Sequence, residues 1–336
     1  MQLQRFKDEF DSIFQDHITQ KITELKTLYS ETLFDELLKY LHEYVQEWKR
    51  FRPYLVYLLY MACWWRDTTY IMKVWVCFEL LHVFALIHDD ICDKGTIRHS
   101  RDTYHIWLGK KLGSEEEGIS QAILVGDLIL FRVQHDFYEI VSDPQAKKQF
   151  GANLQELVYG QMMDVYFSGT KTMFSLQDIS LKDKLKSWRY SFMRPMCVGA
   201  ALAGEKDIQE IALLWDLLGE AFQLRDDLID ILDTHTNKTP FSDITEGNQT
   251  RLFSYAYTHA SPQQKAYLEQ ARHRQLSDSE KEELKRIYAD TWAITHTTET
   301  LTSLLQTAKE HIERIDRADK SYQIHMFEIV TLLTKW

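Results

Sequence analysis

Apolar residues recur every three or four positions along most of this chain, and no stretch alternates apolar and polar residues as a strand would. The pattern therefore predicts an all-helical protein. We expect helices at 2–28, 30–44, from 53 onward, and at about 70–93, 118–141, 145–168, 180–204, 207–234, 249–259, 262–273, 278–308 and 310–335. The segments 94–114 and 234–248 are polar and irregular, which is typical of loops that close over a ligand.

The two most apolar of these helices, 70–93 and 207–234, both end in clusters of aspartates. The first cluster is Asp89, Asp90 and Asp93, and the second is Asp226, Asp227 and Asp230. In each cluster, carboxylates at positions i and i+4 share one face of the helix. Such carboxylates repel one another and are costly beside apolar turns unless a cation neutralises them. The two clusters together predict a site for a hard multivalent metal, with Mg²⁺ and a phosphate-rich substrate as the natural occupants.

The bulk composition favours one domain that does not bind nucleic acid. A chain of 336 residues could form about two domains, but it contains only five prolines and twelve glycines and no linker-like tract. We therefore expect a single domain over residues 1–336. The net charge of −11 disfavours a surface that tracks nucleic-acid phosphates.

The cysteines and the hydropathy pattern indicate a cytoplasmic protein without a membrane span. Four cysteines are scattered without CxxC spacing, which is typical of reduced core thiols. The first 14 residues lack the apolar core of a signal peptide. The longest apolar run, 54–65, is shorter than the about 20 residues that cross a bilayer.

Basic residues accompany both aspartate clusters. They are Lys49 and Arg52 before the third helix, Arg98 after the first cluster, Lys186, and Lys238 after the second cluster. Diphosphate chemistry needs metals that bridge the oxygens and fixed cations that complete the neutralisation. The combination points to a diphosphate substrate.

The sequence resembles the trans-isoprenyl diphosphate synthases, also called polyprenyl synthetases. Residues 86–93 (LIHDDICD) and 222–230 (FQLRDDLID) are similar to the two aspartate-rich motifs of that family. Further matches lie between residues 48 and 250, and these are 49–53 (KRFRP), 123–127 (ILVGD), Gly160-Gln161 with Asp164, Lys186-Ser187, and 241–244 (FSDI).

The resemblance implies a helical bundle around a deep pocket and a homodimer. It also implies a prenyltransferase that condenses isopentenyl diphosphate with an allylic diphosphate. Three Mg²⁺ would hold the allylic diphosphate, with Asp89, Asp93 and Asp226 as direct ligands and Asp90, Asp227 and Asp230 in support.

The same resemblance assigns the remaining site residues. Arg98, Lys186 and Lys238 match contacts to the allylic diphosphate, and Gln223 matches a group beside the reacting carbons. The substrate-binding positions also include Lys49, Arg52 and His82 of the isopentenyl diphosphate pocket, and Gln161 of the Gly160-Gln161 match.

Several departures from the family pattern keep other functions open. His99 stands where a second arginine is usual, and Trp48 replaces a glycine, both on the isopentenyl side. Histidine is only a conditional cation. A terpene synthase that ionises one allylic diphosphate is therefore one alternative. A non-catalytic subunit of a heteromeric prenyl synthase is a minor alternative, because such subunits generally lose an aspartate motif and this chain keeps both. Asn248 also replaces a usual lysine, and Ser187 a usual threonine.

Product length is expected to depend on the helix before Asp89. In the family, a bulky residue four or five positions upstream of this aspartate ends chain growth early. Phe84 is bulky and Ala85 is small. This combination resembles the enzymes that make geranylgeranyl diphosphate (C20).

Overall fold

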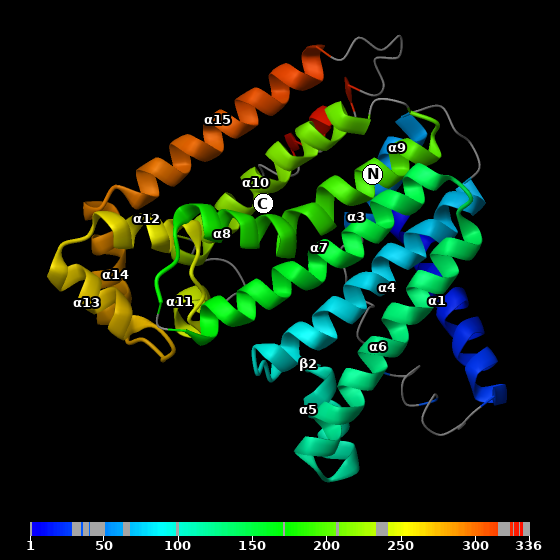
Figure 1. Ribbon diagram of the computed structural model, residues 1–336, viewed down its shortest axis with the longest axis horizontal. Helices are drawn as coiled ribbons and strands as arrows, with labels where there is room; N and C mark the ends of the chain where they lie inside the picture. The colour runs from blue at the N-terminus through cyan, green and yellow to red at the C-terminus, as the bar shows by residue number, and fades with distance from the viewer. Residues whose placement is uncertain are drawn as a thin grey trace. The chain divides into compact units, whose positions relative to one another are not determined.

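The computed structural model describes residues 2–28, 35, 40, 51–62, 68–98, 101–170, 172–205, 208–232, 241–314, 323–324, 326–328 and 330–331. Within them, helices make up the regular structure apart from one short hairpin, which confirms the all-α prediction (Figure 1). The chain divides into two compact units, 1–147 with 201–204, and 148–200 with 205–336. The single domain expected from the sequence stays a prediction.

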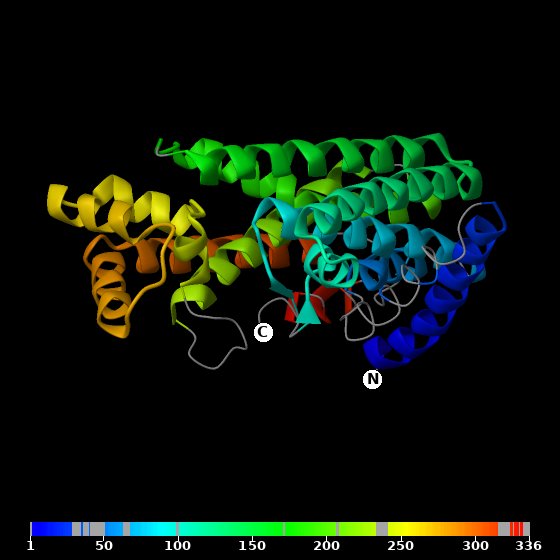
Figure 2. The ribbon, with the colours of Figure 1, turned by 90° about the horizontal axis from the view of Figure 1, so that it is seen from below.

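The first unit is built around one long apolar helix, α4 (Thr68–Cys92), which packs against α3 and α6. Its other helices are α1 (Gln2–Leu28), α3 (Phe51–Ala62), α5 (Tyr104–Leu112), α6 (Glu115–Ile140) and the start of α7 (Pro144–Gly169). The strands β1 (Ile97–Arg98) and β2 (Arg101–Asp102) follow α4 and pair antiparallel. Figure 1 labels β2, and Figure 2 shows the same ribbon turned by 90°.

The α4 helix is apolar on nearly all sides because it is buried on nearly all sides. Trp75 and Phe78 are fully buried, and their rings contact Phe6 of α1 and Phe137 of α6. Residues Tyr70–Cys92 are long and apolar enough to cross a membrane, but 72% of an apolar 18-residue window within them is buried inside the protein. We therefore assign α4 to the core.

The segment 94–114, expected as an irregular loop, contains the hairpin and α5. The α5 helix ends at Gly113, whose φ of 74° is left-handed, and the Ser114 hydroxyl then caps α6 by accepting from Glu117 N at 3.2 Å. Gly118 lets α5 approach α6 closely, since a Cβ there would lie 2.5 Å from the His105 carbonyl oxygen.

The second unit is arranged around α10 (Ile208–Leu232), which packs against η1 and α15. Its other elements are most of α7, α8 (Leu176–Asp183), the π-helix η1 (Lys184–Met193), most of α9 (Arg194–Leu202), α11 (Ser242–Glu246), α12 (Arg251–His259), α13 (Pro262–Ala271), α14 (Asp278–Asp290) and α15 (Ala293–Arg314). The helix predicted at 180–204 is thus three consecutive pieces. The approach of η1 to α10 depends on Gly219, where a Cβ would lie 2.5 Å from Cβ of Trp188.

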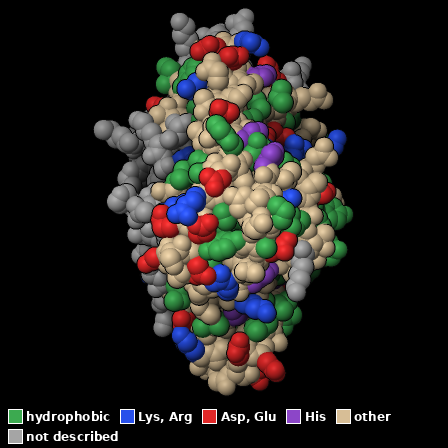
Figure 3. Space-filling model, turned by 90° about the vertical axis from the view of Figure 1, so that its left-hand side faces the viewer, with side chains coloured by type: hydrophobic (Ala, Val, Ile, Leu, Met, Phe, Trp, Pro, Cys, Tyr) green, Lys and Arg blue, Asp and Glu red, His purple; other side chains and the backbone are tan. Residues whose placement is uncertain are grey.

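The last part of the chain forms shorter capped helices. Ser261 and Ser277 begin α13 and α14 with reciprocal capping boxes. The helix predicted at 278–308 is interrupted at Trp292, whose φ is 63°, so that α14 ends and α15 begins. Acidic and basic side chains are interspersed on the face in Figure 3. On α14, Lys285 and Glu282 form an i, i+3 ion pair.

Candidate functional site

The first aspartate cluster lies at the C-terminal end of α4. Arg98, brought back by the β1 strand, donates from Nε to Asp90 Oδ1 at 2.7 Å and from Nη2 to Asp89 Oδ2 at 3.2 Å. Asp90 is buried, whereas Asp93 is exposed at the end of the helix. The guanidinium therefore neutralises the buried carboxylate and leaves Asp93 facing solvent.

The last turns of α4 before this cluster are closely packed. The Phe84 ring meets His88 edge-on, with ring centroids 4.7 Å apart, and His88 Nε2 lies 3.1 Å from the Ile123 carbonyl oxygen of α6. Gly126 makes this approach possible, because a Cβ there would lie 2.1 Å from His88 Nε2. Ala85 is half-buried on the same helix. His82, expected in the isopentenyl diphosphate pocket, is also half-buried on α4.

The second cluster is near the end of α10, and Asp227 is its most buried member. Asp227 is 2% exposed; its Oδ1 accepts from Gln223 Nε2 at 3.0 Å, and its Oδ2 has no hydrogen-bond partner among the described residues. Burial and the charge of nearby Asp183 together raise the pKa of Asp227 to about 7. This carboxyl group needs a proton or a cation. Asp226 is half-buried beside it.

Asp230 has a different environment from Asp227. Its Oδ1 accepts from Ser242 N at 3.0 Å and Ser242 Oγ at 2.7 Å, and its Oδ2 accepts from Asp243 N at 3.4 Å. Its main-chain oxygen accepts from Phe241 N at 2.9 Å. Asp230 thus fixes the start of α11 to α10, and its expected support of a metal site stays a prediction.

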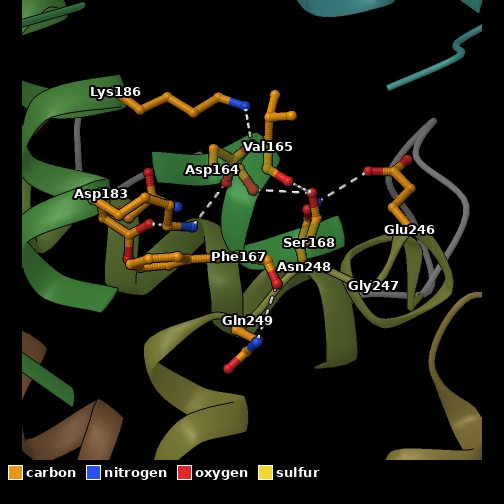
Figure 4. Close-up of polar contacts among 12 residues, drawn as sticks. Asp164, Val165, Phe167, Ser168, Asp183, Lys186, Glu246, Gly247, Asn248 and Gln249 are labelled. Carbon is orange, nitrogen blue, oxygen red and sulfur yellow. Dashed lines mark hydrogen bonds and ion pairs between the residues drawn. The ribbon is translucent and has the colours of Figure 1, made fainter. Parts of the chain in front are cut away.

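Lys186 lies on the π-helix η1, and π-helical turns are frequent at functional sites. Its ammonium is 2.5 Å from Asp164 Oδ2 of α7 (Figure 4). The backbone of η1 comes very near α7 at this point, since a Cβ on Gly160 would lie 2.2 Å from Lys186 N. Gln161 is half-buried on the following position of α7.

The sequence did not reveal two buried charged residues near Lys186, which are Lys182 and Asp183. Lys182 lies between Asp164, at 3.2 Å, and Asp183, at 2.8 Å. Burial raises the pKa of Asp164, but the ammonium groups of Lys182 and Lys186 outweigh burial, so the net pKa is below its usual range. The i, i+4 spacing of the two lysines was the signal that could have revealed this cluster.

Gln249 is a further buried residue that the sequence did not reveal. Its amide donates to the main-chain oxygens of Phe167 and Thr172 at 3.2 and 2.9 Å, and its oxygen accepts from Phe174 N at 3.1 Å (Figure 4). It ties the end of α7 and the segment that follows α7 to the segment before α12. A lone glutamine before a helix cap carries no distinctive sequence signal.

Some predicted residues lie outside the described part of the structure. These are Lys49, His99 and Lys238, together with the side chain of Arg52, whose backbone is in α3. The two aspartate clusters belong to different units, so their joint site stays a prediction. Among the described residues, no group of three or more His, Cys, Asp or Glu side chains could hold a metal ion by itself.

The donor chemistry of the described residues nevertheless fits Mg²⁺. Carboxylate oxygens are the ligands this ion prefers. The buried Oδ2 of Asp227 lacks a hydrogen-bond donor within the described residues, and the pKa of this group is raised, so a cation would relieve an unfavourable burial.

Comparisons with known proteins agree with these features. Residues 33–291 match the sequence profile of the Polyprenyl synthetase family. A short chain isoprenyl diphosphate synthase from Methanocaldococcus jannaschii is 29% identical over 254 residues, 73% of each chain. A geranylgeranyl diphosphate synthase from Methanosarcina mazei is 26% identical over 217 residues, 62% of this chain and 63% of that protein.

The fold is similar to that of a solved geranylgeranyl pyrophosphate synthase from Corynebacterium glutamicum, which was crystallised with isoprenyl diphosphate and magnesium. The two share 21% sequence identity and a TM-score of 0.86, and the match covers 98% of this chain and 99% of that chain. The family profile spans most of the chain and includes both aspartate clusters. This chain belongs to the polyprenyl synthetase family and is a prenyltransferase.

Proposed function

We propose that this prenyltransferase uses Mg²⁺, held jointly by the two aspartate clusters, to condense isopentenyl diphosphate with an allylic diphosphate to give geranylgeranyl diphosphate (C20). The observation that supports the proposal most is the matched pair of acidic clusters near the ends of the buried apolar helices α4 and α10. In one of them, Asp227 retains a buried oxygen without a hydrogen-bond donor among the described residues.

The reaction breaks the bond between the allylic carbon and the diphosphate. When bound, Mg²⁺ supplies positive charge that stabilises the diphosphate as it departs. The isopentenyl double bond attacks the resulting allylic cation, and the released diphosphate takes up the proton that the new product loses. We expect three Mg²⁺, with Asp89, Asp93 and Asp226 as direct ligands.

The chain's own residues would orient and neutralise the substrates. Lys186 and Arg98 lie next to carboxylates of the candidate site and can place fixed positive charge near the allylic diphosphate. The Gln223 amide, fixed by Asp227, would lie beside the reacting carbons. We carry over the roles of the other residues from the family pattern, with Lys238 at the allylic diphosphate, and Lys49, Arg52, His82, His99 and Gln161 as further substrate-binding residues.

The C20 product rests on the residues before Asp89. Phe84 is buried and packed on His88, and the small Ala85 leaves space on the adjacent position of α4. A growing chain that ran along α4 would pass Ala85 and meet Phe84 as its first large obstacle. Farther from the cluster, the fully buried Phe78 lies on the face of α4 that contains Ala85, seven residues away.

We further propose a cytoplasmic homodimer. Large apolar side chains are exposed along one face of α6 and along one face of α7, and such patches mark interaction surfaces. They are Leu124, Phe131 and Tyr138 on α6, and Tyr159, Met162 and Tyr166 on α7. Burial raises the pKa of the Cys197 thiol to about 12, so that this cysteine remains a protonated core residue.

A terpene synthase on the same scaffold is the second candidate. It is favoured by one feature of the sequence, the replacement of two usual groups on the isopentenyl side by His99 and Trp48. Such an enzyme would ionise one allylic diphosphate and ignore isopentenyl diphosphate.

Incubation with labelled isopentenyl diphosphate and each allylic primer separates the two functions. Products are analysed before and after phosphatase treatment. A labelled C20 alcohol that appears only after phosphatase supports the condensation. Conversion of farnesyl or geranylgeranyl diphosphate into an unlabelled hydrocarbon or alcohol would replace it with the terpene synthase.

A further inference from the structure

Asp164 is shared between two lysines of unequal accessibility. Lys186 contacts its Oδ2 at 2.5 Å, and Lys182 contacts its Oδ1 at 3.2 Å. The side chain of Lys186 is 23% exposed, but that of Lys182 is only 7% exposed. Figure 4 shows Lys186 reaching Asp164 from η1. Of the two lysine side chains, that of Lys186 is therefore the more accessible to a ligand from solvent.

Lys182 is itself held on two sides. Its ammonium contacts Asp183 at 2.8 Å in addition to Asp164. Burial lowers the pKa of Lys182, but these two carboxylates outweigh burial and the net pKa is raised. Lys182 is therefore a charged group that carboxylates hold on two sides.

This arrangement changes what happens when Lys186 leaves Asp164. A buried carboxylate that loses its only counter-ion is strongly unfavourable. Here Asp164, which is 5% exposed, would still be paired with Lys182. Because Lys182 still neutralises Asp164, Lys186 can leave this carboxylate for a ligand without the free-energy cost of an unpaired buried charge.

We propose that Lys182 is a positioning residue that keeps Asp164 paired, so that Lys186 can exchange this carboxylate for an oxygen of the allylic diphosphate. The inference rests on the proposed function, in which Lys186 binds that diphosphate. Asp183 has the complementary task of holding Lys182 in place from the opposite side.

The test is the steady-state kinetics of Lys182→Met with farnesyl diphosphate as the varied substrate. This variant removes the ammonium and keeps the length of the side chain. We expect KM for farnesyl diphosphate to rise by about tenfold or more, with a smaller change in kcat. Lys182→Arg retains the charge and should restore most of the affinity.

Two further variants separate positioning from folding. Lys182→Met leaves Asp183 unpaired, so Lys182→Met/Asp183→Asn removes both members of that buried pair and should fold while keeping the raised KM. Lys182→Met/Asp164→Asn removes the charge that retains Lys186, and KM should return toward that of the wild type. Lys184→Met, whose lysine pairs with Asp216 at 3.0 Å and does not contact Asp164, is the matched control with an unchanged KM.

The outcomes distinguish this inference from the proposed function. If the wild type turns over farnesyl diphosphate but the folded Lys182→Met/Asp183→Asn variant has the wild-type KM, only the role of Lys182 is overturned. The same holds if Asp164→Asn fails to reverse the effect of Lys182→Met. A wild type that neither binds nor converts any allylic diphosphate would overturn both.

Discussion

Arg98 Nε lies 2.7 Å from Asp90 Oδ1, so the buried second carboxylate of the first cluster is paired with a guanidinium from the following strand. Loss of this guanidinium would remove a charged partner from a buried carboxylate, which is unfavourable. The pairing explains how an acidic cluster can end an apolar core helix. It also gives Arg98 a structural task that can be measured without substrate.

The Arg98→Met variant should lower the free energy of unfolding by roughly 1–3 kcal/mol, which allows for the partial exposure of the arginine. Urea denaturation of the wild type and the variant measures this difference. Lys110→Met breaks the exposed ion pair with Asp102 and should change stability by less than about 1 kcal/mol. Equal losses in the two variants would contradict the proposed importance of the buried pair.

The raised pKa of Asp227 predicts how stability depends on pH in the absence of metal. Between its ordinary value of 3.8 and about 7, the carboxyl group is protonated in the folded state and ionised in the unfolded state. Its stabilising contribution is therefore complete below about pH 4 and is lost as the pH rises through about 7.

The Asp227→Asn variant should consequently gain stability relative to the wild type as the pH rises, by roughly a few kcal/mol at pH 8. Thermal or urea unfolding in the presence of a chelator at pH 5, 6, 7 and 8 measures the trend. Asp278→Asn, at the exposed start of α14, is the matched control. A stability difference for Asp227→Asn that does not vary with pH would show that this carboxyl group is ionised in the folded protein.

Product length should respond to the wall of α4. Phe84→Ala should lengthen the product beyond that of the wild type, because it removes the first large obstacle, and Ala85→Phe should shorten it toward C15 by filling the upper passage. Chromatography of the dephosphorylated products measures both effects. Phe14→Ala removes a buried ring from α1 and should cost stability without changing product length. Unchanged product distributions in both α4 variants would mean that this helix does not line the pocket.

The homodimer predicts that a charge on the exposed apolar faces of α6 or α7 will dissociate the protein. Phe131→Glu and Met162→Glu should each shift the mass measured by light scattering from dimer toward monomer. Leu112→Glu places the same charge on an exposed residue of α5 and should leave the mass unchanged. A monomeric wild type, or variants that both remain dimeric, would contradict this interface.

The long helices could be predicted because their apolar period is determined locally. The segments that became α4, α6 and α10 follow this pattern, and their approximate ends agree with the structure. The π-helical stretch 184–193 could not be predicted, since it depends on close packing against α7 and α10 at glycines such as Gly160 and Gly219. The break between α14 and α15 at Trp292 could not be predicted either, because no proline or glycine lies there.

The candidate site could likewise be predicted only in part. The aspartates were recognisable from their spacing, because i and i+4 carboxylates share a helix face. The partners of these charges come from other elements, as when Asp230 meets Ser242 or Lys182 meets Asp164. Only tertiary packing brings such groups together, so their roles were not visible in the sequence.

We propose that Mg²⁺ held by both aspartate clusters drives the condensation. The steady-state rate of isopentenyl diphosphate incorporation should be measured as a function of Mg²⁺ concentration for the wild type, Asp89→Ala and Asp226→Ala, with Asp278→Ala as the control. We predict a strict requirement for Mg²⁺ in the wild type and a fall of several orders of magnitude in each site variant, because each loses charge stabilisation of the leaving diphosphate. Near-normal incorporation by either folded site variant, or incorporation by the wild type without a divalent metal, would contradict the joint site.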